Sequence, residues 1–344
     1  MKTLELGRAG IKVSDWCLGT MTYGTHTLDE DSHRQIDMSL EAGINFLDVA
    51  EMYPVNPVAK ETMGMSEQAI GRWLAKSGRR SEVVIATKIC GAGEFRPKGY
   101  SAAAVQEAVD RSLSYLQTDY IDLYQLHWPN RGSYHFRQNW GFDPSKQDRA
   151  RVMANMEDTL RGLEEAVQAG KIRAVGLSNE SAWGTMSWLN LAKEFNLPRM
   201  ASIQNEYSLL CRLYDTDMAE LAVHEDITLL SYSPLGAGLL TGKYQNGAVP
   251  AGSRMDINGN LGGRKTDNAF AAVAAYLDIA NRHGLDLVHM AMAWQRRRPF
   301  PISAIFGATN VAQLERILAG DSVELSDEVM VEIDAAHKLH AMPY

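Results

Sequence analysis

The sequence predicts an α/β fold of the (β/α)8 TIM-barrel class, and two observations carry this prediction. Short apolar runs alternate with helical patterns along the chain, and eight such strand and helix units follow one another. An alternation of this kind indicates parallel strands joined by right-handed crossovers. Eight units are the number that closes a parallel sheet into a barrel. With no linker or low-complexity segment, we expect one barrel domain over residues 1–344.

The second observation separates the barrel from its alternative, an open doubly wound sheet. Such a sheet usually carries a G-x-G-x-x-G fingerprint directly after its first strand. Here the first strand leads into Thr20-Met21-Thr22-Tyr23-Gly24, which lacks that pattern. The glycines between Gly236 and Gly242 come late in the chain and at a different spacing. The missing fingerprint therefore favours the closed barrel.

The expected elements run in order from an N-terminal β-hairpin, residues 3–6 and 11–13, with a glycine-containing turn. The expected barrel strands are residues 16–19, 45–49, 83–87, 121–126, 174–177, 201–204, 228–232 and 304–306. Helices are expected where apolar residues recur at helical spacing between capping residues and glycines. They are residues 29–41, 66–77, 101–116, 153–169, 181–195, 216–225, 269–283 and 311–319, with an extra helix at 286–297. Long loops, 128–151 and 235–268, follow strands 4 and 7.

Composition excludes several classes of protein. A formal net charge of -8 argues against a general nucleic-acid binder. No run approaches the roughly 18 apolar residues of a membrane span, and the N-terminus lacks the apolar core of a signal peptide. The cysteines number 3 and form no C-x-x-C motif, which fits a reducing cytoplasm. His337 and His340 lack a further ligand nearby, so no metal site is expected.

Four polar side chains stand at the carboxyl ends of the second, third and fourth expected strands. Asp48 and Tyr53 follow the second strand, Lys88 ends the third, and His127 ends the fourth. A parallel barrel delivers the carboxyl ends of all its strands to one mouth, where active sites of this fold lie. We therefore expect these four side chains to meet there.

This set suits donation of a proton to a carbonyl oxygen. A tyrosine hydroxyl with a pKa of about 10 is a weak acid at pH 7, and a nearby ammonium lowers that pKa. Lys88 can lower the pKa of Tyr53, while Asp48 keeps the lysine charged. His127 can hydrogen-bond the carbonyl and orient it. None of the four is an obvious covalent nucleophile, so a hydride cofactor is the natural source of electrons.

Four motifs surround these residues. They are Leu47-Asp48-Val49-Ala50-Glu51-Met52-Tyr53, Ile85-Ala86-Thr87-Lys88, Asp122-Leu123-Tyr124-Gln125-Leu126-His127-Trp128-Pro129 and Gly170-Lys171-Ile172-Arg173-Ala174-Val175-Gly176-Leu177-Ser178-Asn179. Together they resemble the aldo-keto reductase superfamily over almost the whole chain. Two further stretches, Ala50-Glu51-Met52-Tyr53-Pro54 and Ile203-Gln204-Asn205-Glu206-Tyr207-Ser208-Leu209-Leu210, resemble its bacterial Tas-like branch, which is similar to the β subunits of voltage-gated potassium channels. The resemblance implies reduction of aldehydes and ketones by NADPH, with Tyr53 as general acid, Lys88 and Asp48 tuning it, and His127 orienting the carbonyl.

The resemblance also implies a set of NADP(H) contacts. The nicotinamide end would touch Ser178, Asn179, Gln204 and Tyr232, and Thr20, Met21 and Asp48 would also contact the cofactor. The pyrophosphate would lie along Ser233, Pro234, Leu235 and Gly236, with charge from Lys243 and Arg254. The adenosine 2′-phosphate end would be held by Gly307, Thr309 and Gln313. Related proteins often carry an asparagine where this chain has Ile317, beside Arg316. Arg316 can be read as a contact to the 2′-phosphate or as a solvated helix residue, which leaves the preference for NADP over NAD open.

Aromatic and sulfur side chains near the mouth are candidate substrate contacts. They are Tyr23, Met52, Trp128 and Tyr207, with Tyr134, Phe136 and Trp140 on the first long loop. Such side chains commonly line ligand pockets. The substrate expected from the resemblance is a small-molecule carbonyl compound, and the sequence indicates no particular oligomeric state. Two other functions stay open: an NADP(H)-binding redox sensor with slow turnover, and an aldolase that uses Lys88 as a Schiff-base amine.

Overall fold

The computed structural model describes residues 1–344 and contains a closed barrel of eight parallel strands, in the order β10-β3-β4-β5-β6-β7-β8-β9. This confirms the predicted TIM barrel. The barrel strands are β3 (Trp16–Gly19), β4 (Phe46–Asp48), β5 (Val84–Ile89), β6 (Ile121–Leu126), β7 (Ile172–Ser178), β8 (Met200–Glu206), β9 (Thr228–Tyr232) and β10 (Ile302–Phe306). Each overlaps one of the expected apolar runs.

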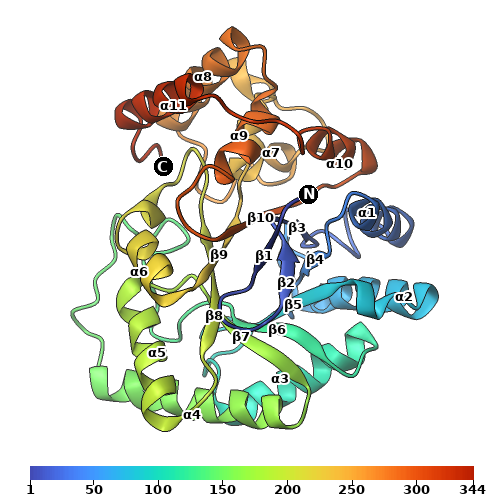
Figure 1. Ribbon diagram of the computed structural model, residues 1–344, viewed down its shortest axis with the longest axis vertical. Helices are drawn as coiled ribbons and strands as arrows, with labels where there is room; N and C mark the ends of the chain where they lie inside the picture. Colours follow the sequence, from blue (N-terminus) through green and yellow to red (C-terminus); the bar gives the residue numbers. More distant parts are fainter.

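Helices surround the strands, as Figure 1 shows. They are α1 (Asp29–Glu41), α2 (Met65–Ser77), α3 (Ala102–Leu116), α4 (Arg149–Gln168), α5 (Ala182–Phe195), α6 (Asp217–Glu225), α7 (Arg254–Ile257), α8 (Asp267–Arg282), α9 (Leu287–Gln295), α10 (Val311–Leu318) and α11 (Asp327–Leu339). Helix α9 is the predicted extra helix. The sequence reading did not include α7 or α11. None of the helices has both the length and the apolar character needed to cross a bilayer.

The two long connections are more structured than expected. The first long loop, residues 127–148, is shorter than predicted because α4 starts at Arg149, four residues before the expected position. The cause is local: the Asp148 side chain accepts a hydrogen bond from the backbone nitrogen of Arg151 and caps the helix. The second long loop, residues 233–266, contains two short 3-10 segments, η4 (Gly236–Thr241) and η5 (Gln245–Gly247), besides α7.

The N-terminal hairpin closes one end of the barrel. Its strands β1 (Thr3–Glu5) and β2 (Lys12–Ser14) pair antiparallel and lie across the barrel strands in Figure 1. The backbone nitrogen of Gly7 donates to the hydroxyl of Thr228, at the start of β9. Hairpin residues join inward-facing strand residues in one apolar cluster, which comprises Leu6, Ile11, Val13, Cys17, Phe46, Val84, Ala86, Leu123, Ala174, Ala201, Leu230 and Ile305. Because this plug fills the amino-terminal end, the site lies at the other end.

On four strands the inner face of the barrel changes from apolar to polar toward the carboxyl end. Successive residues of a strand point to opposite faces, so residues two apart share the interior. Apolar Ala86 is thus followed on the inner face of β5 by Lys88. The same step leads to the other polar residues, in the pairs Phe46 and Asp48, Leu123 and Gln125, and Leu230 and Tyr232. The alternation of these four strands therefore places Asp48, Lys88, Gln125 and Tyr232 at the mouth.

Candidate active site

Lys88 lies at the centre of the site. Its side chain is 0% exposed, and its Nζ donates to Asp48 Oδ1 at 2.6 Å and to the Val49 carbonyl oxygen at 2.7 Å. The same Nζ lies 4.8 Å from the centroid of the Tyr53 ring. The Tyr53 and His127 rings meet edge to face, with centroids 5.8 Å apart. The structure thus brings together all four residues that the sequence singled out.

The charge on Lys88 is secured by its partners. Burial by itself lowers the pKa of Lys88, but Asp48 and Tyr53 outweigh burial and the pKa is raised. The Tyr53 pKa differs from the sequence-based expectation. Burial raises the pKa of Tyr53 by more than Lys88 lowers it, because the ring packs against the apolar core. Tyr53 is consequently protonated in the neutral pH range, as a general acid must be.

His127 is a neutral imidazole in this environment. Burial, assisted by the positive charge of Lys88, holds the pKa of His127 well below its ordinary value of 6.5. Its Nδ1 is buried without a hydrogen-bond partner. A buried N–H without an acceptor is costly, so this arrangement favours the tautomer with the proton on Nε2. His127 can then donate one hydrogen bond to a carbonyl oxygen without carrying a charge.

A ring of amides and hydroxyls connects the quartet to the predicted nicotinamide contacts. Gln204 Nε2 donates to Asp48 Oδ2 at 2.8 Å and to Gln125 Oε1 at 3.2 Å, which leaves Gln204 Oε1 to accept from a ligand. The Ser178 hydroxyl donates to the Gln204 carbonyl oxygen at 2.8 Å. The Thr20 hydroxyl donates to the Asp48 carbonyl oxygen, also at 2.8 Å. These side chains therefore form one connected polar floor.

Two further residues complete the predicted nicotinamide contacts. Asn179 Nδ2 donates to the His127 carbonyl oxygen at 2.9 Å, and the Tyr232 hydroxyl donates to Asn179 Oδ1 at 2.8 Å. Tyr232 stays half-buried at the end of β9. Met21 is also half-buried, and its carbonyl oxygen accepts from the backbone nitrogen of Val55 at 3.0 Å.

The segment after β9 has the geometry of an anion-binding turn. Ser233, Gly236, Ala237 and Gly238 all have left-handed backbone angles, with φ of 55°, 56°, 57° and 93°. The turn is closed by its own hydrogen bonds, from the Gly236 nitrogen to the Ser233 carbonyl oxygen at 2.8 Å and from the Gly238 nitrogen to the Leu235 carbonyl oxygen at 3.0 Å. A Cβ on Gly236 would come within 2.9 Å of Leu210 Cδ1, so a glycine is needed there. An alternation of right- and left-handed residues, as at Leu235 and Gly236, is typical of anion-binding backbone turns, and the predicted pyrophosphate contacts Pro234 and Leu235 lie within it.

Two cations of the second long loop lack an anionic partner. Arg254 forms no ion pair, and its Nε is buried with no hydrogen-bond acceptor. Burial, assisted by the charge of Arg264, lowers the pKa of Arg254 to about 10. Lys243 is half-buried and has its Nζ 5.1 Å from the centroid of the Tyr244 ring. Lys243 Cε lies 3.5 Å from where a Cβ on Gly238 would stand, and the charge of Arg264, which contacts Ser233, acts on Arg254. Unpaired, partly buried cations of this kind are a fitting donor set for a phosphate.

The predicted adenosine end lies at the start of α10. Gln313 Oε1 accepts from the Thr309 backbone nitrogen at 3.0 Å, and Gly307 is exposed nearby. Arg316 is found in an ion pair with Asp286, at 2.9 Å, on the helix surface. Of the two readings left open for Arg316, the structure favours the surface role, because its guanidinium already has a carboxylate partner.

The candidate substrate residues divide into two groups. Met52 and Trp128 are half-buried beside the quartet, and the Trp128 ring lies against His127 with centroids 4.9 Å apart. Tyr23 and Tyr207 are fully buried in the core instead. The Tyr23 hydroxyl donates to Gln35 at 3.2 Å.

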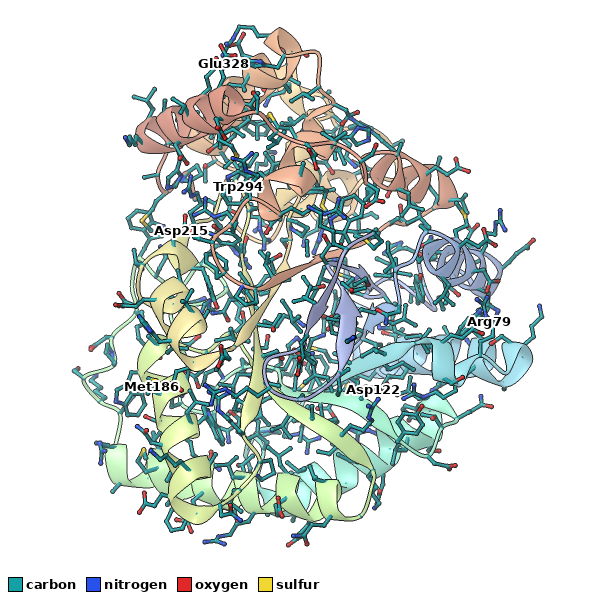
Figure 2. The ribbon with its side chains drawn as sticks, in the orientation of Figure 1. Arg79, Asp122, Met186, Asp215, Trp294 and Glu328 are labelled. Atoms are coloured by element: carbon teal, nitrogen blue, oxygen red, sulfur yellow. The ribbon has the colours of Figure 1, made fainter.

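The Tyr207 side chain packs in the core against α9. Its ring stacks on Trp294 with centroids 5.1 Å apart, and its hydroxyl bonds to Asp215. Figure 2 labels both partners. The structure therefore does not bring Tyr23 or Tyr207 to the mouth as the sequence predicted. The spacing from a strand end placed them nearby but could not show which way the rings turn.

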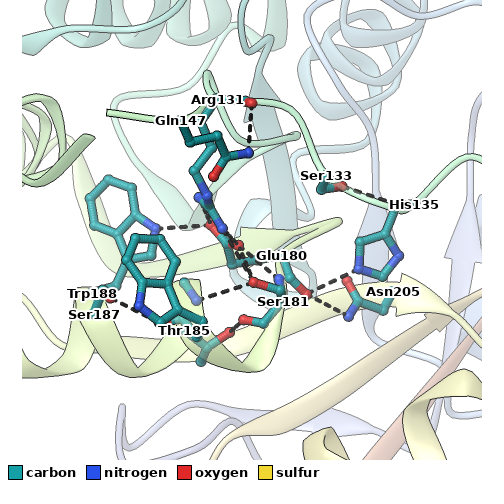
Figure 3. Close-up of polar contacts among 12 residues, drawn as sticks. Arg131, Ser133, His135, Gln147, Glu180, Ser181, Thr185, Ser187, Trp188 and Asn205 are labelled. Carbon is teal, nitrogen blue, oxygen red and sulfur yellow. Dashed lines mark hydrogen bonds and ion pairs between the residues drawn. The ribbon is translucent and has the colours of Figure 1, made fainter. Parts of the chain in front are cut away.

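Buried carboxylates anchor the first long loop. The Glu180 carboxylate accepts hydrogen bonds from both terminal nitrogens of Arg131, one of them at 2.8 Å, and from the Trp188 indole nitrogen (Figure 3). The Glu180 carbonyl oxygen lies 3.0 Å from His135 Nε2 and accepts from Asn205 at 3.1 Å. Arg131 is thus a structural anchor of the loop.

Sequence reasoning missed several residues of the mouth. Gln125 joins Gln204 beside Asp48, and its signal was available, since it lies two residues from both Leu123 and His127 on the inner face of β6. Glu206 and Arg264 form a buried ion pair at 2.7 Å. That pair had no sequence signal, because its members are 58 residues apart and one lies in an irregular loop.

Comparison with known proteins agrees with this geometry. The family described as "Aldo/keto reductase family" matches residues 16–338. The chain belongs to the aldo/keto reductase family. It is therefore an oxidoreductase of a family that acts on small-molecule carbonyl substrates and generally uses NAD(P)H.

Relatives of this aldo/keto reductase cover all or nearly all of its length. "Protein tas" of Escherichia coli (strain K12) is 44% identical over 349 residues, covering 100% of this chain and 99% of that protein. "Probable voltage-gated potassium channel subunit beta" of Arabidopsis thaliana is 30% identical, covering 96% and 95%. "Uncharacterized oxidoreductase YrpG" of Bacillus subtilis (strain 168) is 28% identical, covering 96% and 94%. The resemblance found in the sequence motifs is confirmed.

A buried carboxyl group outside the quartet makes the stability of this aldo/keto reductase depend on pH. Burial raises the pKa of Glu67 to about 7, from 4.5, although Thr87 donates to it at 2.6 Å. Ser112 and Arg111 also lower this pKa, whereas Glu51 raises it. Since the folded state then binds more protons between these two values, stability falls as pH rises toward 7 and the contribution is lost above it.

We expect Glu67→Gln to flatten this dependence. The wild-type free energy of unfolding should fall between pH 5 and pH 8 by more than that of the variant, with a difference of up to about 3 kcal/mol. Urea unfolding at both pH values measures this difference. Parallel pH profiles for the two proteins would show that Glu67 does not titrate in this range.

Proposed function

We propose that this chain is an NADPH-dependent reductase that converts aldehydes and ketones to alcohols, with Tyr53 as general acid. One observation carries the proposal: the fully buried Lys88 ammonium is held by Asp48 at 2.6 Å and lies 4.8 Å from the Tyr53 ring. At that separation and an effective dielectric of about 20, the ammonium stabilises a phenolate by about 3 kcal/mol. The arrangement therefore assists loss of the Tyr53 proton at the moment a carbonyl oxygen needs it.

The residues divide the work of carbonyl reduction. A bound nicotinamide supplies a hydride to the carbonyl carbon. Tyr53 gives its proton to the carbonyl oxygen, which becomes the alcohol hydroxyl. The raised pKa of Tyr53 is compatible with this step, because an alkoxide is a stronger base than a phenolate. Neutral His127 donates from Nε2 to the same oxygen and orients it, and solvent returns a proton to Tyr53.

The cofactor proposal rests on the donor set. Gln204 Oε1, with Ser178 and Asn179 beside it, suits a carboxamide, and the half-buried Tyr232 ring suits stacking. The left-handed Ser233–Gly236 turn and the unpaired Arg254 and Lys243 suit a pyrophosphate. Because Cys17, Cys90 and Cys211 are all free thiols, the proposal also includes a reducing compartment such as the cytoplasm.

The test is a titration with NADPH and NADH, followed by an aldehyde and ketone panel with the cofactor that binds more tightly. We expect carbonyl-dependent loss of NADPH absorbance. Tight NADPH binding without turnover of any compound would instead favour a redox-sensing partner protein, a function suggested by the similarity to the potassium channel subunit of Arabidopsis thaliana. Failure to bind either cofactor would contradict both.

The unpaired Arg254 gives a prediction that separates affinity from stability. Arg254→Met should weaken binding of NADPH and NADH alike by about 10- to 100-fold, because a charge-assisted hydrogen bond to the shared pyrophosphate contributes about 1.5–3 kcal/mol. The same change should not lower the melting temperature of the free protein, since Arg254 has no partner to lose.

Fluorescence titration and thermal unfolding measure the two effects. A loss of affinity confined to NADPH would place Arg254 at the 2′-phosphate and contradict the pyrophosphate assignment. A lower melting temperature would show that Arg254 has a structural partner after all.

A further inference from the structure

Glu206 joins the two long loops of the mouth through a single carboxylate. It ends β8 with a side chain only 6% exposed. Its Oε2 accepts from Arg137 of the first long loop at 3.0 Å, and its Oε1 accepts from Arg264 of the second long loop at 2.7 Å. Two positively charged arginines, one from each loop, bind the same buried carboxylate and hold both loops to the same point of the barrel.

Arg264 contacts the turn that is proposed to bind the cofactor pyrophosphate. Its Nη2 lies 3.4 Å from the Ser233 hydroxyl oxygen, and its Nη1 donates to the Leu261 carbonyl oxygen at 3.1 Å. Ser233 begins the left-handed turn after β9. Arg264 therefore ties the far part of the second long loop back to the start of that loop, across the place proposed for the pyrophosphate.

The Arg137 arm reaches the aromatic wall beside His127. Arg137 and its neighbour Phe136 both have left-handed backbones, with φ of 64° and 56°. Non-glycine residues adopt this conformation at a cost of about 1–3 kcal/mol and keep it only when surrounding contacts impose it. The Phe136 ring meets Trp128 edge to face at 6.1 Å, and Trp128 lies against His127. The Arg137 ion pair thus holds Phe136 in the wall.

The C-terminal tail completes the arrangement. The Tyr344 hydroxyl donates to Glu206 Oε1 at 3.0 Å, and the Thr266 hydroxyl bonds to the Pro343 carbonyl oxygen. The arginine ion pairs keep Glu206 ionised, and the pKa of its carboxyl is lowered although burial alone raises it. Its two contacts with the loops, to Arg137 and Arg264, are therefore ion pairs that depend on its charge.

We propose that Glu206 is a positioning residue that fixes the cofactor loop and the substrate wall relative to each other. Loss of its charge would free Arg264 and Arg137 together, so bound NADPH would dissociate faster and the carbonyl substrate would be held more weakly. The inference rests on the proposed function, since it assigns the second long loop to the cofactor and the first to the substrate.

The barrel offers a matched control at its opposite end. Asp122, labelled in Figure 2, is likewise buried on a barrel strand, and its carboxylate accepts from Arg80 at 2.8 Å and from Arg173 at 2.6 Å. It lies near the start of β6, on the side that the hairpin covers. Glu206→Gln and Asp122→Asn therefore remove equivalent charges, one at the mouth and one away from it.

The experiment compares the two variants in four measurements: thermal stability, NADPH dissociation rate, aldehyde KM, and tryptic cleavage of the cofactor-free protein. Both variants should lose stability. Glu206→Gln alone should release NADPH about 10-fold faster, raise KM, and be cut faster after Lys146 and Lys243, in the two long loops. Equal behaviour of the two variants in the last three measurements would overturn the proposal.

Variants that remove only one of the two arginines cover the case in which Glu206→Gln does not fold. Arg264→Met should speed NADPH dissociation, whereas Arg137→Met should raise the aldehyde KM without changing NADPH dissociation. If both variants change stability alone, the proposal is wrong. The cleavage measurement also keeps this test apart from the proposed function, because it needs neither cofactor nor turnover. Suppose that the wild-type protein shows no turnover but that only Glu206→Gln is cleaved faster by trypsin. The role of Glu206 in holding the loops would then stand, and the reductase assignment would be wrong.

Discussion

Replacing Tyr53 with phenylalanine is expected to lower kcat for aldehyde reduction by about 10²- to 10⁴-fold, the usual contribution of a positioned general acid. The variant keeps the ring that packs against the core and against His127, and removes only the proton donor. NADPH affinity should stay within a factor of about two, since the hydroxyl is assigned to the carbonyl and not to the cofactor. Steady-state kinetics and fluorescence titration measure the two quantities.

Tyr124→Phe is the matched control. Tyr124 is fully buried on β6, and its hydroxyl has no hydrogen-bond partner. It does not contact the quartet, because it alternates with the inward-facing Leu123 and Gln125. This variant should keep the wild-type kcat. Tyr53→Phe with an undiminished rate would remove Tyr53 from its role and leave His127 or water to supply the proton.

The quartet could be predicted from sequence because it depends on regular structure. Asp48, Lys88 and His127 stand within one residue of the carboxyl ends of β4, β5 and β6, so recognising the strands was sufficient to place them together. Closure of the barrel follows from counting strand and helix units. Local periodicity contains both facts, and neither requires knowledge of a loop conformation.

Properties that depend on three-dimensional packing could not be predicted in the same way. The direction of the Tyr53 pKa follows from how tightly its ring is enclosed, which residue spacing does not express. Tyr207 follows a strand end as His127 does, yet its ring turns toward Trp294. The ion pairs of Glu206 with Arg137 and Arg264 join residues from a strand and two loops, and no periodic pattern relates these residues. Loop side chains find partners through the tertiary fold, so the mouth was the least predictable part.

Replacing Lys88 with methionine is expected to destabilise the protein by about 3–5 kcal/mol, because it leaves the Asp48 carboxylate buried without its counter-charge. The remaining donors to Asp48 Oδ2 are neutral amides, Gln125 at 3.3 Å and Gln204 at 2.8 Å. The Val49 carbonyl oxygen also loses its partner. Catalysis should fall as well, since the phenolate of Tyr53 would form without a nearby cation. Urea unfolding and kcat measurements report the two losses separately.

The double variant Asp48→Asn with Lys88→Met distinguishes a structural ion pair from a catalytic one. Removing both charges eliminates the unpaired carboxylate, and replacing a buried pair by neutral groups is often close to neutral for stability. We expect the double variant to recover at least about 2 kcal/mol relative to Lys88→Met, while kcat stays as low as in the single variant. A double variant as unstable as the sum of its parts would show that the two residues stabilise the barrel independently. Recovery of kcat would show that the Lys88 charge acts only through folding. Recovered stability without recovered activity is the result expected if the ammonium is kept in the core to serve Tyr53.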